Sequence, residues 1–134
     1  FILTEIISTN LSLGYSDTDA RVDAGNDYET YDVSFGLNFA FPWAYIAISN
    51  SVSFNDYKKE DTTVSSNKLR SDYTNTFDIM FTKAIGDFLP IIDPNRSLFI
   101  NLSYEKLFSE GNMHNYDYIA DSVSMSFSKS FRFN

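Results

Sequence analysis

The chain has 134 residues, a net charge of −8 at pH 7 and no cysteine. This length predicts a single domain covering residues 1–134, and the lack of cysteine excludes disulfide bonds and thiolate metal sites. The acidic charge disfavours a nucleic-acid partner, because phosphate backbones are bound by basic surfaces, and no run of about eighteen apolar residues is present to form a transmembrane helix.

The sequence is organised as six segments in which apolar and polar residues alternate. A period of two is typical of β-strands with two chemically different faces, and none of the segments has a helical period. In chain order the segments cover 2–15, 29–41, 44–54, 69–85, 98–108 and 118–133. The sequence therefore predicts an all-β fold, an antiparallel meander of about six long strands.

The segment that ends the chain has the clearest alternation. One face holds Ser122, Ser124, Ser126, Ser128 and Ser130, and the other holds Val123, Met125, Phe127, Phe131 and Phe133. A soluble barrel carries its apolar face inward, so alternation alone leaves the orientation open. The length of this segment favours a strand that spans a membrane. Soluble strands typically have about five or six residues, whereas a tilted strand that crosses a bilayer needs about nine to eleven.

We therefore expect transmembrane strands whose polar faces line an interior and whose apolar faces contact lipid. The residues expected to face lipid are Val33, Phe35, Leu37, Ile46, Ile48, Phe77, Ile79, Ile100, Val123 and Phe127. In the rival interpretation, a soluble barrel with a hydrophobic cavity, the same residues would be packed against one another.

The connections between the segments differ in length and polarity. Pro42 and Trp43 form a tight turn, whereas residues 16–28, 55–68 and 109–117 are long, polar and charged. Outer-membrane barrels have short periplasmic turns and longer extracellular loops. We therefore expect the Pro42–Trp43 turn in the periplasm and the three long loops outside.

The connection 86–97 then falls on the periplasmic side and is longer than this rule predicts. It contains the apolar residues Phe88, Leu89, Ile91 and Ile92 together with Pro90 and Pro94, which predicts a loop packed at the barrel rim. Aromatic residues also gather at both ends of the strands, as in the belts that lie at the level of lipid headgroups.

The end of the chain carries a family resemblance. Residues 126–133, Ser-Phe-Ser-Lys-Ser-Phe-Arg-Phe, resemble the C-terminal signature strand of bacterial outer-membrane β-barrel proteins, although Ser128 replaces the usual glycine and Asn134 follows the last aromatic. Residues 115–118 and the strand after them are similar to the last hairpin of barrels fused to periplasmic repeats, such as the surface lipoprotein assembly modifiers.

The resemblance implies a location in the bacterial outer membrane, with the lipid bilayer and the outer-membrane assembly machinery as partners. That machinery reads the terminal strand in this family, so the resemblance assigns the assembly signal to Phe127, Phe131 and Phe133.

Six strands are too few for a closed barrel. Single-chain outer-membrane barrels start at about eight strands, and six would leave no room for the interior side chains. An open sheet would expose unpaired backbone groups to lipid, at several kcal/mol each. We therefore expect one of three arrangements: the chain is the C-terminal part of a larger barrel whose further strands belong to the same protein, several copies share one barrel, or another chain supplies the missing strands. The first is favoured, because Phe1 falls almost immediately on a strand.

The expected interior face is rich in serine, threonine and asparagine and has an acidic excess. Its candidate pore-lining residues are Asp32, Asp72, Asp78, Glu105, Ser124 and Ser128. Such a wall accommodates water and mildly favours cations. The sequence therefore favours a pore or translocation conduit. The alternative is a scaffold barrel that anchors a partner protein and conducts nothing, and an outer-membrane hydrolase ranks third.

Catalysis has little support in the sequence. His114, the only histidine, lies three residues from Asp117 in a polar loop. Outer-membrane proteases of the omptin type use Asp and His on extracellular loops, but sequence proximity does not make a catalytic pair. We interpret His114 as a solvated loop residue and expect neither enzymatic activity nor a cofactor.

The loop 17–27 raises the question of Ca²⁺ binding. Its oxygen ligands are Asp17, Asp19, Asp23, Asn26 and Asp27. The spacing departs from that of an EF-hand, because Arg21 occupies a ligand position and Val22 replaces the required glycine. A solvated acidic loop is the default interpretation, and Ca²⁺ binding is left open.

Overall fold

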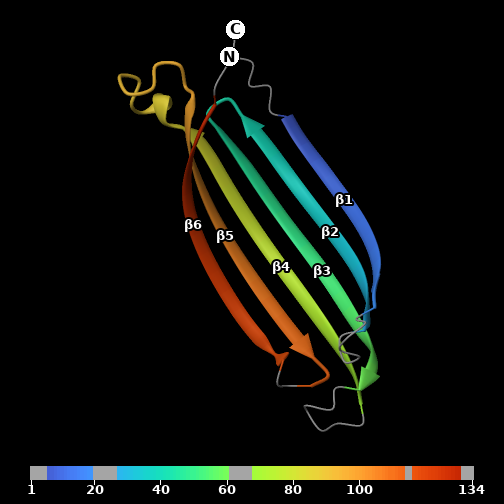
Figure 1. The fold of residues 1–134 in the computed structure, drawn as a ribbon. Coiled ribbons are helices and arrows are strands. Elements are labelled where there is room, and N and C mark those ends of the chain that lie inside the picture. The colour runs from blue at the N-terminus through green and yellow to red at the C-terminus, as the bar shows by residue number, and fades with distance from the viewer. Residues whose placement is uncertain (1–5, 20–26, 61–67, 114–115, 131–134) are drawn as a thin grey trace.

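The computed structural model of the chain describes residues 6–19, 27–60, 68–113 and 116–130, which form one antiparallel sheet (Figure 1). Its strands are β1 (Ile6–Thr18), β2 (Tyr28–Phe41), β3 (Ala44–Glu60), β4 (Leu69–Ala84), β5 (Leu98–Gly111) and β6 (Tyr118–Lys129), and a 3-10 turn, η2 (Ile85–Asp87), follows β4. Each strand pairs with the next in chain order. The predicted all-β meander of six long strands is confirmed.

The observed strands differ from the expected segments mainly at β3. The polar residues 55–60 continue this strand, whereas the sequence had assigned them to a loop. Residues 55–57 pair with the start of β2, where Thr30 Oγ1 donates a hydrogen bond to Asn55 Oδ1 at 2.7 Å. Because these residues are polar on both faces, they lack the alternation from which the other strands were predicted.

The strand register gives the sheet two distinct faces. Partners across an antiparallel ladder project to the same side, so a row of partners defines a face. The row Leu37, Ile48, Ile79, Tyr104 and Val123 runs across the apolar face. The row shifted by one residue runs across the polar face, through Gly36, Ser49, Asp78, Glu105 and Ser122.

No second layer covers either face within the described residues. Their only buried apolar residues are Ala44 and Met113, while Val123 is 81% and Phe127 60% exposed. The residues expected to face lipid therefore share one uncovered face and are not packed against one another in a core. Sheets in water bury one face against another element, so this sheet is incomplete as a soluble fold.

The sheet is open at both edges. β1 and β6 are the outermost strands and do not pair with each other, and every residue of β6 is exposed. The expectation that this chain does not close the sheet by itself is confirmed for the described residues.

The connections lie at two opposite ends of the sheet (Figure 1). The turn end carries the β2–β3 turn and the β4–β5 connection, and the loop end carries the connections that follow β1, β3 and β5. No helix in the described part of the chain is long and apolar enough to cross a membrane.

Candidate functional site on the polar face of the sheet

The candidate pore-lining residues lie on one face of the sheet. The register places Asp32, Asp72, Asp78, Glu105, Ser124 and Ser128 on the polar face. They come from four strands, so the meander brings together side chains that are far apart in the sequence. The sheet register therefore points these side chains to the same side of the sheet.

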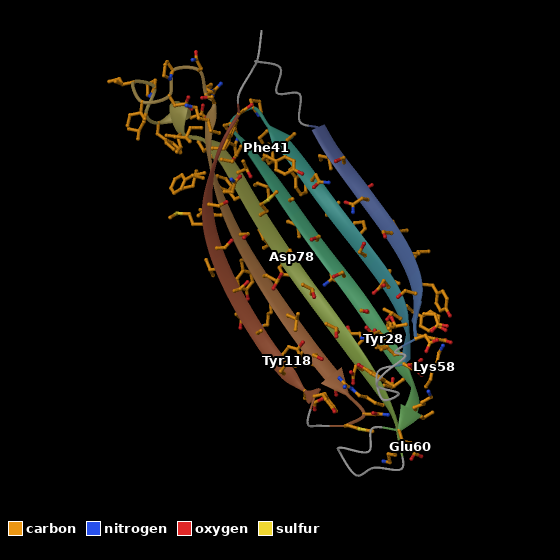
Figure 2. The ribbon with its side chains drawn as sticks, viewed as in Figure 1. Tyr28, Phe41, Lys58, Glu60, Asp78 and Tyr118 are labelled. Carbon is orange, nitrogen blue, oxygen red and sulfur yellow. The ribbon has the colours of Figure 1, made fainter. Side chains whose placement is uncertain are left out.

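A pair of carboxylates occupies the centre of this face. Asp78 on β4 stands directly opposite Glu105 on β5, and Figure 2 shows Asp78 near mid-sheet, between Phe41 at the turn end and Lys58 at the loop end. Ser49 Oγ donates a 3.4 Å hydrogen bond to Asp78 Oδ2. None of the ion pairs among the described residues involves Asp78 or Glu105. Two adjacent, unneutralised carboxylates concentrate negative potential at this point.

Hydroxyl and amide groups form ladders beside this pair. The Oγ atoms of Ser103 and Ser124 lie 2.7 Å apart, and Asn101 Nδ2 donates a hydrogen bond to Ser128 Oγ at 3.2 Å. Thr82 Oγ1 donates in turn to Asn101 Oδ1 at 2.9 Å. These neutral groups satisfy one another across strands and present a wettable surface with no charge of its own.

Asp72 differs from the other candidate carboxylates. It is only 5% exposed and forms an ion pair with Arg70, whose guanidinium lies 4.5 Å from the ring centre of Tyr57 and 3.4 Å from that of Tyr116. The facing Gly111 leaves room for the carboxylate, since a Cβ atom there would lie 2.7 Å from Asp72 Oδ1. The charge of Asp72 is therefore neutralised, and the group holds three strands and a loop together at the loop end.

No local pattern in the sequence indicates this cluster around Arg70. Its aromatic residues come from β3 and from the connection after β5, so no local spacing links them to Arg70. Only the sheet register and the return of the chain before β6 bring them together.

The candidate assembly signal is described in part. Phe127 lies on the apolar face of β6, opposite Ile100, and is 60% exposed. Phe131 and Phe133 lie outside the described residues.

Two lysines of β3 contact the two ends of the loop 17–27. Lys58 Nζ lies 2.6 Å from Asp17 Oδ1, and Lys59 Nζ lies 2.8 Å from Asp27 Oδ2. Residues 20–26, and with them Arg21, Val22, Asp23 and Asn26, lie outside the described residues, as does His114. Among the residues that the structure describes, no group of three or more His, Cys, Asp or Glu side chains could hold a metal ion.

Some polar residues interrupt the apolar face, and they pair with each other. Asn50 Nδ2 donates a hydrogen bond to Asn75 Oδ1 at 2.6 Å, and Asn75 Nδ2 donates to the Tyr73 hydroxyl at 3.1 Å. Towards β6, the Tyr104 hydroxyl donates to Asp121 Oδ1 at 2.6 Å. Mutual hydrogen bonding is what lets polar groups sit on an apolar surface at low cost.

Comparison with protein-family models, curated proteins and solved structures finds no match to this chain. The class that fold and site define is therefore an all-β protein with an open, six-stranded antiparallel meander whose faces differ in polarity. The difference in polarity between the two faces is the feature that bears on function.

Proposed function

We propose that the sheet is part of the wall of an outer-membrane β-barrel and that its polar face lines an aqueous conduit. The observation that supports this most is the single-layer sheet, whose apolar face is uncovered while its strands are 12 to 17 residues long. In water such a face would be strongly unfavourable, whereas lipid covers it without any second layer. Strands of this length exceed the roughly nine to eleven residues that a tilted crossing needs.

The polar face supports conduction rather than chemistry. Asp32, Asp78 and Glu105 add negative charge to a wall of hydroxyl and amide groups, with no ion pair to neutralise them among the described residues. Rings of carboxylates favour cations over anions in pores. The proposed conduit therefore prefers cations, and it requires no cofactor.

In this proposal, further strands pair with the two open edges of the sheet to complete the barrel. Because the number of strands is even, β1 and β6 run in opposite directions, so β6 of one copy can pair antiparallel with β1 of another while both faces and both ends are preserved. Pairing β1 with β1 of a second copy would turn one copy upside down in the membrane. Further strands of the same protein or of another chain meet the same requirement if they run antiparallel to each edge.

Conductance of the purified protein in planar lipid bilayers tests the proposal. We expect stepwise openings and a reversal potential that indicates cation preference in a salt gradient. A trace that stays closed at all voltages, from protein shown to be inserted, would overturn the conduit and favour a scaffold barrel that anchors a partner.

A further inference from the structure

The connection between β4 and β5, residues 85–97, extends beyond the turn end of the sheet (Figure 1), and its apolar side chains are exposed. Ile91 is 97% exposed, Ile92 67%, Phe88 54% and Leu89 48%. This is the most exposed apolar group outside the strands in the described part of the chain, and the sequence had predicted that it packs at the rim.

The exposed apolar side chains lie on a loop whose backbone conformation is held by hydrogen bonds. Phe88 N donates a hydrogen bond to Ile85 O at 3.0 Å, and Ile92 N donates to Leu89 O at 3.0 Å. A Cβ atom on Gly86 would lie 2.2 Å from the carbonyl oxygen of Asp93, so only glycine fits there. The backbone thus positions the apolar side chains outward.

Asp93 fixes the return of the loop into β5. Its Oδ1 accepts hydrogen bonds from Ser97 N at 2.9 Å and Ser97 Oγ at 3.0 Å, and its Oδ2 accepts one from Leu98 N at 2.8 Å. A single buried carboxylate therefore joins the end of the loop to the first residue of the strand.

The carboxylates of the loop are turned away from its outer surface. Asp93 is buried, and the side chain of Asp87 is 11% exposed between Arg96 and Lys83. The exposed charged side chain of the loop is Arg96, at 59%. Because Arg96 pairs with Asp87, the outer surface of the loop carries apolar groups and a guanidinium but no exposed carboxylate. In a chain with a net charge of −8, this local lack of exposed anions suits a lipid surface that carries phosphates.

An aromatic column connects the loop to the apolar face of the sheet. Lys83 Nζ lies 5.4 Å from the ring centre of Phe88 and 5.3 Å from that of Trp43. Trp43 stacks on Phe41 at 5.4 Å, and Phe41 on Phe39 at 6.2 Å. Tryptophan beside a lysine at the border of an apolar surface is typical of the bilayer interface, where the lysine amine reaches the headgroups.

We propose that loop 85–97 is a membrane anchor that inserts Ile91 and Ile92 into the lipid leaflet at the turn end of the sheet. This inference rests on the proposed function, because a lipid-facing sheet brings the loop to the bilayer. Lipid fits better than a protein partner, since the exposed tip offers hydrocarbon only and protein interfaces carry about one hydrogen bond per 100–200 Å².

Depth-dependent fluorescence quenching tests the anchor. The chain has no cysteine, so Ile91→Cys, Val123→Cys and Asn112→Cys each give one site for an environment-sensitive fluorophore. The full chain is reconstituted in vesicles of phosphatidylethanolamine and phosphatidylglycerol that contain phospholipids spin-labelled on the acyl chain. We expect the probes at 91 and 123 to lose most of their fluorescence, and the probe at Asn112, which is exposed at the loop end, to lose little.

The other outcomes separate the anchor from the barrel wall. Quenching at Val123 without quenching at Ile91 would overturn the anchor and leave the lipid-facing sheet intact. A probe at Ile91 that is shielded from both the lipid quencher and aqueous iodide would also overturn it, in favour of a second copy covering the loop. Quenching at neither position would overturn the proposed function together with the anchor.

Discussion

Asp78 and Glu105 stand opposite each other on β4 and β5, and neither forms an ion pair within the described residues. Like charges placed directly across an antiparallel ladder destabilise a sheet. The pair therefore does not stabilise the sheet. In the proposed conduit it would attract cations. A passing or resident cation would relieve the repulsion, which couples the pair to the proposed conduit.

Removing both charges is expected to raise the stability of the sheet and to lower the cation preference of the conduit. The double change Asp78→Asn with Glu105→Gln should stabilise the sheet by up to about 1 kcal/mol, because a like-charge pair is removed. It should also shift the reversal potential in a salt gradient towards zero. Ser103→Ala serves as the control, since it removes a polar group from the same face without changing its charge and should not affect selectivity. Unchanged selectivity in the double variant would show that these residues do not line the path.

Arg70 is expected to be the most sensitive cation for stability. Arg70→Gln leaves the buried Asp72 carboxylate unpaired, which typically costs about 3–5 kcal/mol, and it also removes the contacts with Tyr57 and Tyr116. Thermal unfolding of the protein in detergent measures the effect. The matched control is Lys58→Gln, since Lys58 and Asp17 are 39% and 48% exposed and solvent screens the ion pair between them. Equal losses of thermal stability in Arg70→Gln and Lys58→Gln would contradict the stabilising role of Arg70.

The sequence predicted what depends on local pattern. Alternation located all six strands and assigned Val33, Ile79 and Val123 to one face, because a strand repeats every two residues. It missed the end of β3, where residues 55–60 are polar on both faces. It also missed the stacking of Arg70 on Tyr116, because contacts between distant segments depend on register and loop path. The opposition of Asp78 and Glu105, 27 positions apart, likewise depends on register.

Asp93 is expected to make the conformation of loop 85–97 sensitive to acid. Burial opposes ionisation of this carboxyl, but hydrogen bonds from Leu98, Ser97 and Gly86 outweigh it and lower the pKa of Asp93. Because the folded pKa lies below the unfolded value of about 3.9, the stabilisation is complete above that value and is lost as the pH falls through the folded pKa.

Hydrogen exchange of the Ser97 and Leu98 amides against pH measures this loss. Protection should be constant near neutral pH and should fall in strong acid. In Asp93→Asn, protection should be lower and should not titrate over this range. A wild-type loop whose protection does not change in acid would contradict the role of Asp93.

Phe127 and the serines of β6 are expected to respond differently to substitution. Phe127→Asp places a charge on the exposed apolar face beside Ile100, at a cost that increases with depth but stays below the roughly 2–4 kcal/mol of Arg or Lys at the bilayer midplane. Extending the change to Phe131 and Phe133 should lower the amount of protein in the membrane further. Ser124→Ala with Ser128→Ala loses only two exposed cross-strand hydrogen bonds, each contributing about 0.5–1.5 kcal/mol, and should leave membrane levels unchanged. Quantifying the protein in outer-membrane fractions compares the variants, and a serine pair as harmful as Phe127→Asp would show that assembly does not depend on the apolar face.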